Sequence, residues 1–413
     1  MLSLFEIIAA LLALCAAFGW INEKLVRLPS VIGILATTLV ASLLLLAYEH
    51  VSPDTHIREA VATILTQVDF SATLLGGLLA FLLFAGALQT DWGQLRDQRW
   101  AVALLATFGV AASTVLVGYG IYAAAALFGL ALDLRWCFVF GALISPTDPV
   151  SVLALLRHVQ IPKTLEIKIA GESLFNDGVG LVAFSVALAF ATGGEKLGGW
   201  DIGVLFLHET VGGAVLGLVA GAVTVKAMRA VDNYPLEIMI SLALVTCLYA
   251  VALRLGVSGP IAVVIAGILV GNRGARTAMS ETTRRYMFGF WQVVDELLNS
   301  ILFLLIGLEL LIIDFTPSSV MVAGIAIVVV LLARFVSVAV PIFALMEHVF
   351  AAKAVPILTW GGVRGGISVA LALSLPQVPA REPILLTTYA VVIFSILVQG
   401  LTIRPLVRRL IPE

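Results

Sequence analysis

The feature that most constrains this chain is the recurrence of long apolar runs with few charges. Thirteen such runs follow one another between residues 4 and 405, and most hold 18 or more residues. A helix of about 20 apolar residues crosses the roughly 30 Å hydrocarbon core of a bilayer. With 61% apolar residues, 12% charged residues and a mean hydropathy of +1.09, the chain has too few charges for a water-soluble surface. We therefore predict an all-α membrane protein with about 13 transmembrane helices.

Short charged or turn-rich breaks separate the expected spans. The first run lacks the basic start and the small-residue cleavage site of a secretory signal, so it is expected to be a mature span. The stretch 50–69 carries two histidines, Arg58 and Glu59 and is expected to lie at the membrane interface. The spans are expected at 4–22, 30–48, 70–88, 100–128, 136–156, 168–192, 202–228, 235–253, 257–272, 287–313, 318–346, 353–376 and 383–405.

The distribution of basic residues predicts which loops are cytoplasmic. Cytoplasmic loops of membrane proteins carry an excess of Lys and Arg. One set of alternate loops holds 17 of the 24 basic residues, the opposite set holds five, and Arg334 and Arg364 lie inside spans. This asymmetry supports thirteen spans, an N-terminus outside and a C-terminus in the cytoplasm, with a short tail at 406–413. A multi-pass protein of the plasma (inner) membrane is expected.

Thirteen spans also predict an internal repeat. Six spans, one linking span and six further spans place the second six in the opposite orientation to the first, as in the inverted repeats of secondary transporters. We expect one transmembrane domain over 1–413, with the first repeat at about 1–192, the linking helix at about 202–228 and the second repeat at about 235–405.

The fifth span of each repeat contains residues that break helices. One span holds Ser145-Pro146-Thr147-Asp148-Pro149, and the other holds Gly361-Gly362-Val363-Arg364-Gly365-Gly366. Proline removes a backbone donor and glycine weakens a helix, so both spans are expected to be interrupted. Broken backbone is tolerated at membrane depth only inside protein or beside a watery cavity. Two interrupted helices that cross near a binding site are therefore predicted.

The sixth span carries the ionisable residues with the clearest functional meaning. A charged side chain at the centre of a membrane helix costs at least about 2.5–3.5 kcal/mol on insertion scales. Helical spacing places Ser173 and Asp177 on one face and Glu172 and Asn176 on the adjoining one. Asp177 is expected to bind either a cation or a proton, because desolvation favours the protonated carboxyl group and hard cations prefer oxygen ligands. Ser173 and a hydroxyl or freed carbonyl of Thr147 are further candidate ligands.

Several of these charges admit a second interpretation. Glu172 belongs to the ion site or forms a structural ion pair with Arg334, because a buried acid needs a countercharge. Asp148 and Arg364 stand at the two breaks, where half-helix ends carry opposite partial charges, and are expected to compensate those ends more than to contact the ion. Asp177 can also merely satisfy a polar neighbour, although two helix breaks facing it favour the ion site.

Other polar residues are expected to have no part in the site. Asp295, Glu296 and Asn299 begin the tenth span and Glu309 closes it, so solvated helix ends account for them. The five histidines lie in loops or near span ends, which argues against a histidine proton relay at the midplane. Three isolated cysteines predict neither a disulfide nor a metal site, and the net charge of −2 argues against a nucleic-acid partner. No cofactor is expected.

At this point the motifs are recognisable. The segments SPTDP at 145–149, GESLFNDG at 171–178 and GGVRGG at 361–366 together resemble the monovalent cation/proton antiporter superfamily, and specifically its NhaP-like sodium/proton exchanger branch. The resemblance covers essentially the whole chain. It implies sodium/proton exchange in pH homeostasis and a homodimer with a dimerisation part and a core part that moves like an elevator. It also implies a sodium site around Asp177, Glu172, Ser173 and Thr147, with Asn176 beside it, and a structural pairing of Glu172 with Arg334.

The order of Asn176 and Asp177 bears on stoichiometry. The electrogenic branch is similar but carries two adjacent acids at these positions. A single titrating carboxylate exchanges one cation for one proton, so the resemblance and the charge arithmetic both imply electroneutral exchange. The long cytoplasmic tail of the animal exchangers is missing, so regulation through such a tail is not expected.

Three alternatives remain at this stage. A potassium/proton antiporter can use the same carboxylate, since selectivity among Na+, Li+ and K+ depends on cavity size. A cation channel needs a continuous polar pathway, which inverted repeats and an occluded acid disfavour. A hydrolase needs a nucleophile with a base, and no serine motif has a midplane histidine partner. The expected partners are therefore a monovalent cation, protons, the lipid bilayer and a second copy of the chain.

Overall fold

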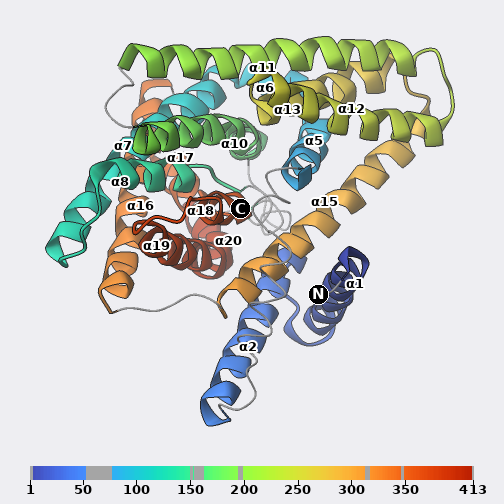
Figure 1. Cartoon of the computed structure of the whole chain (residues 1–413). Coiled ribbons are helices and arrows are strands. Elements are labelled where there is room, and N and C mark those ends of the chain that lie inside the picture. Colours follow the sequence, from blue (N-terminus) through green and yellow to red (C-terminus); the bar gives the residue numbers. More distant parts are fainter. Residues whose placement is uncertain are drawn as a thin grey trace.

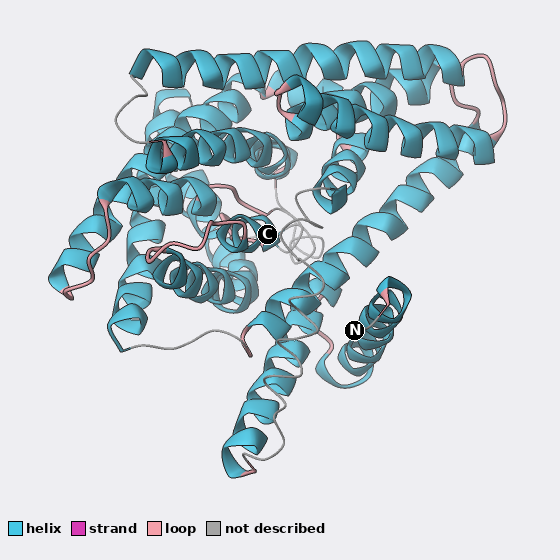
Figure 2. Cartoon of the chain, in the orientation of Figure 1, coloured by secondary structure: helices cyan, strands magenta, loops and turns pink. Residues whose placement is uncertain are grey.

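The computed structural model describes residues 3–52, 77–148, 152, 162–193, 199–311, 317–345 and 348–411. Within these ranges the chain forms helices and short π-helical turns and contains no strand (Figure 2). The first half comprises α1 (Leu4–Ile21), α2 (Ser30–Val51), α5 (Leu79–Gln89), α6 (Trp92–Asp97), α7 (Arg99–Leu127), α8 (Leu134–Ile144) and α10 (Lys163–Thr192). The second comprises α11 (Gly199–Met228), α12 (Tyr234–Leu255), α13 (Gly259–Leu269), α14 (Ala275–Thr277), α15 (Glu281–Glu309), α16 (Pro317–Leu345), α17 (His348–Trp360), α18 (Gly366–Leu373), α19 (Arg381–Phe394) and α20 (Gly400–Leu410).

The helices follow the predicted spans. Nine helical segments in the described ranges are long and apolar enough to cross a membrane, and α5 and α8 are shorter apolar helices. Within the described residues, each of the thirteen predicted spans contains one helix or a helix interrupted by a break, so the all-α membrane fold is confirmed. Most of the predicted interfacial segment, 53–69, and parts of the third and fifth spans lie outside the described residues.

Two helices begin earlier than hydropathy predicts. α10 begins at Lys163, five residues before the predicted span 168–192, so Lys168 lies in its second turn and is 3% exposed. α15 begins at Glu281 because the Ser280 side chain caps it by accepting a hydrogen bond from the Thr283 N–H at 3.3 Å. The first turns of α15 are polar, which hid the start of the helix from a search for apolar runs.

Helix packing pairs the two halves of the chain reciprocally. α7 packs along α16, α2 along α15, and α5 along α13. Counted within each predicted repeat, α7 and α16 are both fourth spans. The second span of the first repeat (α2) packs on the third span of the second repeat (α15), and the third span of the first (α5) packs on the second span of the second (α13). The contacts of α7 with α8 and α10 likewise have counterparts in those of α16 with α17 and α19. Figure 1 shows α15 running between the α1–α2 pair and the part that contains α16 to α20.

Both predicted breaks are present, and they meet. α8 ends at Ile144 and the chain is non-helical over 145–148, while α17 ends at Trp360 and α18 begins only at Gly366. The Asp148 N–H donates to the Val363 carbonyl at 2.8 Å, which joins the two breaks directly. At Gly365 a Cβ atom would lie 2.6 Å from the Cβ of Asp148, so only glycine allows this approach. The two interrupted spans therefore touch through their unwound segments.

Small residues let α11 lie close to α13, as expected for helix-packing surfaces in a membrane. A Cβ atom on Gly217 of α11 would lie 2.2 Å from the Ala262 carbonyl oxygen of α13. At Gly203, near the start of the same helix, a Cβ atom would meet nothing within 4 Å. The first glycine is therefore needed for packing, and the second is not.

This difference gives a test of the helix packing. We expect Gly217→Ala to lower the free energy of unfolding by about 1–3 kcal/mol, because the added methyl group forces the two helices apart. The matched control Gly203→Ala should leave stability unchanged or slightly higher, since alanine favours helix. Thermal and denaturant unfolding in detergent measure both, and equal stability of the two variants would contradict the close approach.

Candidate functional site

The predicted site residues of α10 lie at the centre of the protein. The exposures of Glu172, Ser173, Asn176 and Asp177 are 1%, 3%, 1% and 8%, so bulk solvent has little access to any of them. They occupy one and a half turns of α10 beside the break that follows α8. This part of α10 therefore carries four buried polar side chains next to an unwound segment in the protein interior.

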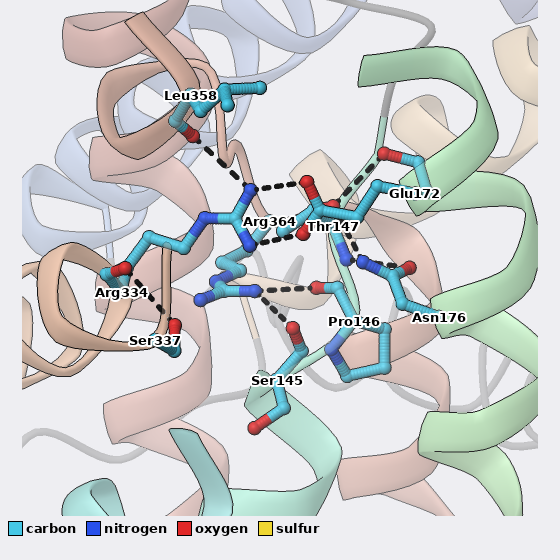
Figure 3. A network of polar contacts seen from close by, with 10 residues as sticks. Ser145, Pro146, Thr147, Glu172, Asn176, Arg334, Ser337, Leu358 and Arg364 are labelled. Carbon is cyan, nitrogen blue, oxygen red and sulfur yellow. Dashed lines mark hydrogen bonds and ion pairs between the residues drawn. The ribbon is translucent and has the colours of Figure 1, made fainter. Parts of the chain in front are cut away.

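Thr147 joins the α8 break to α10. Its hydroxyl lies 2.9 Å from the Ser173 hydroxyl and accepts a hydrogen bond from Asn176 Nδ2 at 2.8 Å. The Thr147 N–H is 3.4 Å from Asn176 Oδ1, so the amide of Asn176 bonds both the side chain and the backbone of Thr147 (Figure 3). With 2% exposure, Thr147 is fixed in position by α10.

Glu172 points away from this network toward α16. Arg334 Nη1 is paired with Glu172 Oε1, and Arg334 Nη2 donates to Oε2 at 2.9 Å, which makes a two-pronged ion pair. Arg334 Nη2 also donates to the Leu358 carbonyl in α17 at 3.2 Å. Both charged side chains are almost fully buried. The structure thus places Arg334 where sequence reasoning expected it, with its charge balanced by Glu172.

Arg364 bonds the other half-helix. Its Nη1 donates to the carbonyl oxygens of Ser145 and Pro146, the latter at 3.0 Å, at the C-terminal end of α8 (Figure 3). The C-terminal end of a helix carries partial negative charge, so a buried guanidinium there is electrostatically favourable. Arg364 is 1% exposed and donates these bonds to backbone oxygens. Its position fits charge compensation at the break.

A cavity of about 610 Å³ leads to this region. Asp177, Thr147 and Asp148 line it, whereas Glu172, Ser173 and Asn176 are not among its described lining residues. Of the five predicted ion-binding residues, the structure therefore brings Asp177 and Thr147 to the cavity and places the other three behind them. Figure 3 shows Thr147 pointing toward Asn176 on α10.

The outer part of the cavity is rich in acids. Asp91, Glu166 and Glu296 line it together with a single described basic residue, Lys163. Hydrogen bonds from the Gln94 side chain and from the Gln94 and Gly93 backbone lower the pKa of Asp91, which lies in a loop outside the spans. Asp91 therefore stays anionic over a wide pH range. Acidic lining raises the local concentration of cations.

Sequence reasoning missed several residues near the site. Asp295, Glu296 and Asn299 were expected at a solvated helix end, but they lie in the middle of α15 and line the cavity. Ser368, in the first turns of α18, also lines the cavity and was not anticipated. Glu309 ends α15 but is only 8% exposed, so the prediction of a solvated end is wrong there too. The Ser280 cap was the sequence signal that would have placed α15 correctly.

The chain matches known proteins over nearly its whole length. Residues 7–409 match the family model described as sodium/hydrogen exchanger, transmembrane. The chain is 44% identical over 412 residues to the Na+/H+ antiporter NhaP of Pseudomonas aeruginosa, covering 98% of this chain and 97% of the relative. It is 36% identical over 391 residues to the Na+/H+ antiporter NhaH of Halobacillus aidingensis, covering 94% and 93%.

A solved structure shares the fold. The sodium proton antiporter MjNhaP1 of Methanocaldococcus jannaschii aligns with a TM-score of 0.75 at 20% identity, covering 99% of this chain and 100% of that one. The family match extends over the breaks, the polar face of α10 and the arginines of α16 and the second break. The chain belongs to the sodium/hydrogen exchanger family of transmembrane proteins.

Proposed function

We propose that this chain is a secondary active sodium/proton antiporter in which Na+ and H+ compete for the carboxylate of Asp177. Membership of the family makes it a transporter and not an enzyme. The relatives named above are Na+/H+ antiporters, which supports sodium as the cation. The observation that carries the proposal is the position of Asp177, a nearly buried acid at the inner end of an acidic cavity.

The described lining of the cavity approaches Asp177 along α10 from the start of that helix, which fits a state of alternating access that is open to one side. Its lining residues on α10 follow one helical face from the first turn inward and stop at Asp177, and no described residue further along α10 lines it. Beyond this point, Gly180 is packed so closely that a Cβ atom would lie 2.3 Å from Pro146 Cγ. The lining residues on α10 are Lys163, Glu166, Ile167, Ala170, Gly171, Leu174 and Asp177.

We further propose that the cavity faces the cytoplasm. The chain enters α10 from a loop that the distribution of Lys and Arg assigns to that side. The start of α2 and the end of α5, assigned to the same side, also line the cavity. An N-terminus outside, a C-terminus in the cytoplasm and residence in the plasma membrane follow from the same assignment.

The charges near the breaks support one-for-one exchange. Three acids, Glu172, Asp177 and Asp148, and two arginines, Arg334 and Arg364, lie in the described residues around the breaks and are nearly all buried. Two fixed positive charges against three carboxylates leave one negative charge. One monovalent cation or one proton neutralises it, which makes the two substrates equivalent in charge. Glu172, which is paired with Arg334, then has a structural role, and Asp177 is the carboxylate that binds Na+ and H+ in turn.

The inverted repeat and the homodimer are part of the same proposal. Reciprocal packing of α2 with α15, α5 with α13 and α7 with α16 supports repeats at about 1–192 and 235–405 joined by the linking helix at about 202–228. A two-fold relation between the halves provides two equivalent arrangements, one open to each side. Movement of a core part relative to a dimerisation part converts the arrangement open to one side of the membrane into the arrangement open to the other side.

Replacement of Asp177 tests the function directly. We expect Asp177→Asn to reduce Na+ uptake driven by a pH gradient in proteoliposomes to the level of empty vesicles, because the amide neither titrates nor carries charge. Glu281→Gln, at the exposed start of α15, is the control and should transport normally. Parallel assays with Na+, Li+ and K+ identify the cation. Exchange that persists in Asp177→Asn would remove this residue from the mechanism, and a preference for K+ would favour the potassium/proton alternative.

The buried ion pair gives a separate prediction about stability. Glu172→Gln should lower the free energy of unfolding by about 3–5 kcal/mol, because it leaves the Arg334 guanidinium buried without a countercharge. The double variant Glu172→Gln with Arg334→Met should recover part of this loss, since the unpaired charge is then removed. Unfolding in detergent measures both effects. An unaltered unfolding transition in Glu172→Gln would argue against a structural pair.

Charge balance predicts how membrane potential affects transport. With potassium gradients and an ionophore setting the voltage across proteoliposomes, the initial rate of exchange should not change, because the cycle moves no net charge. Wild-type protein at matched pH on both sides of the membrane provides the baseline. A rate that follows the applied voltage would rule out one-for-one exchange.

A further inference from the structure

Gln399 lies far from the ion site in the sequence but contacts the end of a broken span. It is the last residue of the π-helical turn Ser395–Gln399, which joins α19 to α20, and it is 2% exposed. The Ser395 hydroxyl donates to Gln399 Oε1 at 2.7 Å, which orients the amide. Gln399 Nε2 then donates to the Trp360 carbonyl at 3.1 Å. Turns of this kind inside α-helices are frequent at functional sites.

This contact completes the C-terminal end of α17. A helix leaves its last four carbonyl groups without partners inside the helix, and in a membrane protein each buried one needs another donor. The Ile357 and Thr359 carbonyls accept from the backbone N–H groups of Gly361 and Gly362 at 2.7 and 3.2 Å. Arg334 bonds the Leu358 carbonyl, and Gln399 bonds that of Trp360. All four carbonyls are thereby satisfied.

The end of α17 in turn determines where the α8 break lies. Four residues after Trp360, Arg364 donates to the carbonyls of Ser145 and Pro146. One residue earlier, the Val363 carbonyl accepts from the Asp148 N–H at 2.8 Å. These contacts hold the chain on both sides of Thr147, which lines the cavity with Asp177. A displacement of Trp360 is therefore transmitted to Thr147 through a short segment of backbone.

We propose that Gln399 is a positioning residue of the ion site, which fixes the Trp360 end of α17 and thereby the backbone of Thr147. The assignment rests on the proposed function, in which the cation binds beside Thr147 and Asp177. Gln399 does not touch the ion. Its side chain links the last spanning helix to the broken span by a hydrogen bond to the Trp360 carbonyl, at the end of α17.

The same pair of helices offers a matched control. The Trp360 indole Nε1 donates to the Thr402 hydroxyl at 2.8 Å, so α20 contacts Trp360 a second time without involving its carbonyl. Thr402→Val removes this bond and leaves the Trp360 carbonyl bonded to Gln399. A general loss of packing between α17 and α20 would affect both variants, whereas loss of the carbonyl contact affects only one.

The test compares Gln399→Met with Thr402→Val in proteoliposomes and in detergent. For Gln399→Met we expect the apparent KM for Na+ to rise roughly three-fold to ten-fold, the cost of one buried hydrogen bond, with a smaller change in maximal rate. Thr402→Val should keep the KM of the wild type. Ser395→Ala, which frees the Gln399 amide without removing it, should give an intermediate KM and serves as the test if Gln399→Met fails to fold.

A second readout does not depend on the transported ion. Hydrogen–deuterium exchange should be faster in Gln399→Met at the backbone amides of Ser145, Thr147, Asp148 and 361–364, and unchanged there in Thr402→Val. An unchanged KM together with unchanged exchange at these amides, in Gln399→Met or in its substitute Ser395→Ala, would overturn the proposal, as would equal effects in Thr402→Val. If the wild-type protein exchanged no cation for protons, the proposed function would fail, while faster amide exchange in Gln399→Met would still support the positioning role.

Discussion

The constraint on which the rest of this structure depends is that backbone polar groups at membrane depth need partners. Two spans break where they touch, and the breaks leave carbonyl and N–H groups without partners in their own helices. Side chains from several helices supply the missing partners: Arg364 at the end of α8, Arg334 and Gln399 at the end of α17, and Asn176 at Thr147. The polar residues of the core are therefore explained first by the breaks, and the ion site occupies the space that they leave.

The same arrangement separates fixed charges from the exchangeable one. Arg334 is committed to Glu172 and to a carbonyl of α17, and Arg364 is committed to carbonyls of α8. Asp177 stands apart from these pairs, faces the cavity and keeps the highest exposure of the four polar residues on its helix segment. A carboxylate that faces a cavity on one side and protein on the other is suited to exchange a bound cation for a proton. In the proposed mechanism this difference in surroundings, more than the identity of the residues, gives neighbouring acids different roles.

Much of the fold could be predicted from the sequence because each membrane span is recognisable from its own run of apolar residues. Apolar runs located the spans in the part of the chain that the structure describes, and proline and glycine located both breaks. The polar face of α10 followed from helical spacing, and the pairing of Glu172 with Arg334 followed from the need to balance a buried charge. Each of these inferences needs only a local sequence pattern or, for the ion pair, the fact that few charged residues lie inside spans.

The remaining features depend on tertiary contacts that leave no local signal. The polar start of α15 disguised its length, so Asn299 was assigned to a helix end instead of a cavity wall. Ser368 and Gln399 look like ordinary helix residues, and only the packing of α18 beside α8 and of α20 beside α17 gives them neighbours of interest. A π-helical turn has no sequence signature comparable to a proline or a glycine pair.

The described lining of the cavity on α10 ends at Asp177, and a pocket that ends there has a consequence for the cell. A pore open at both ends lets ions flow down their gradients and dissipates them, whereas a pocket closed at one end does not let ions leak across the membrane. In the proposed alternating-access mechanism, no ion crosses until the protein rearranges, so the packing that suppresses leakage also slows each turnover. In the proposed mechanism, the close packing of Gly180 against Pro146 beyond Asp177 therefore bears on leakage and turnover rate together.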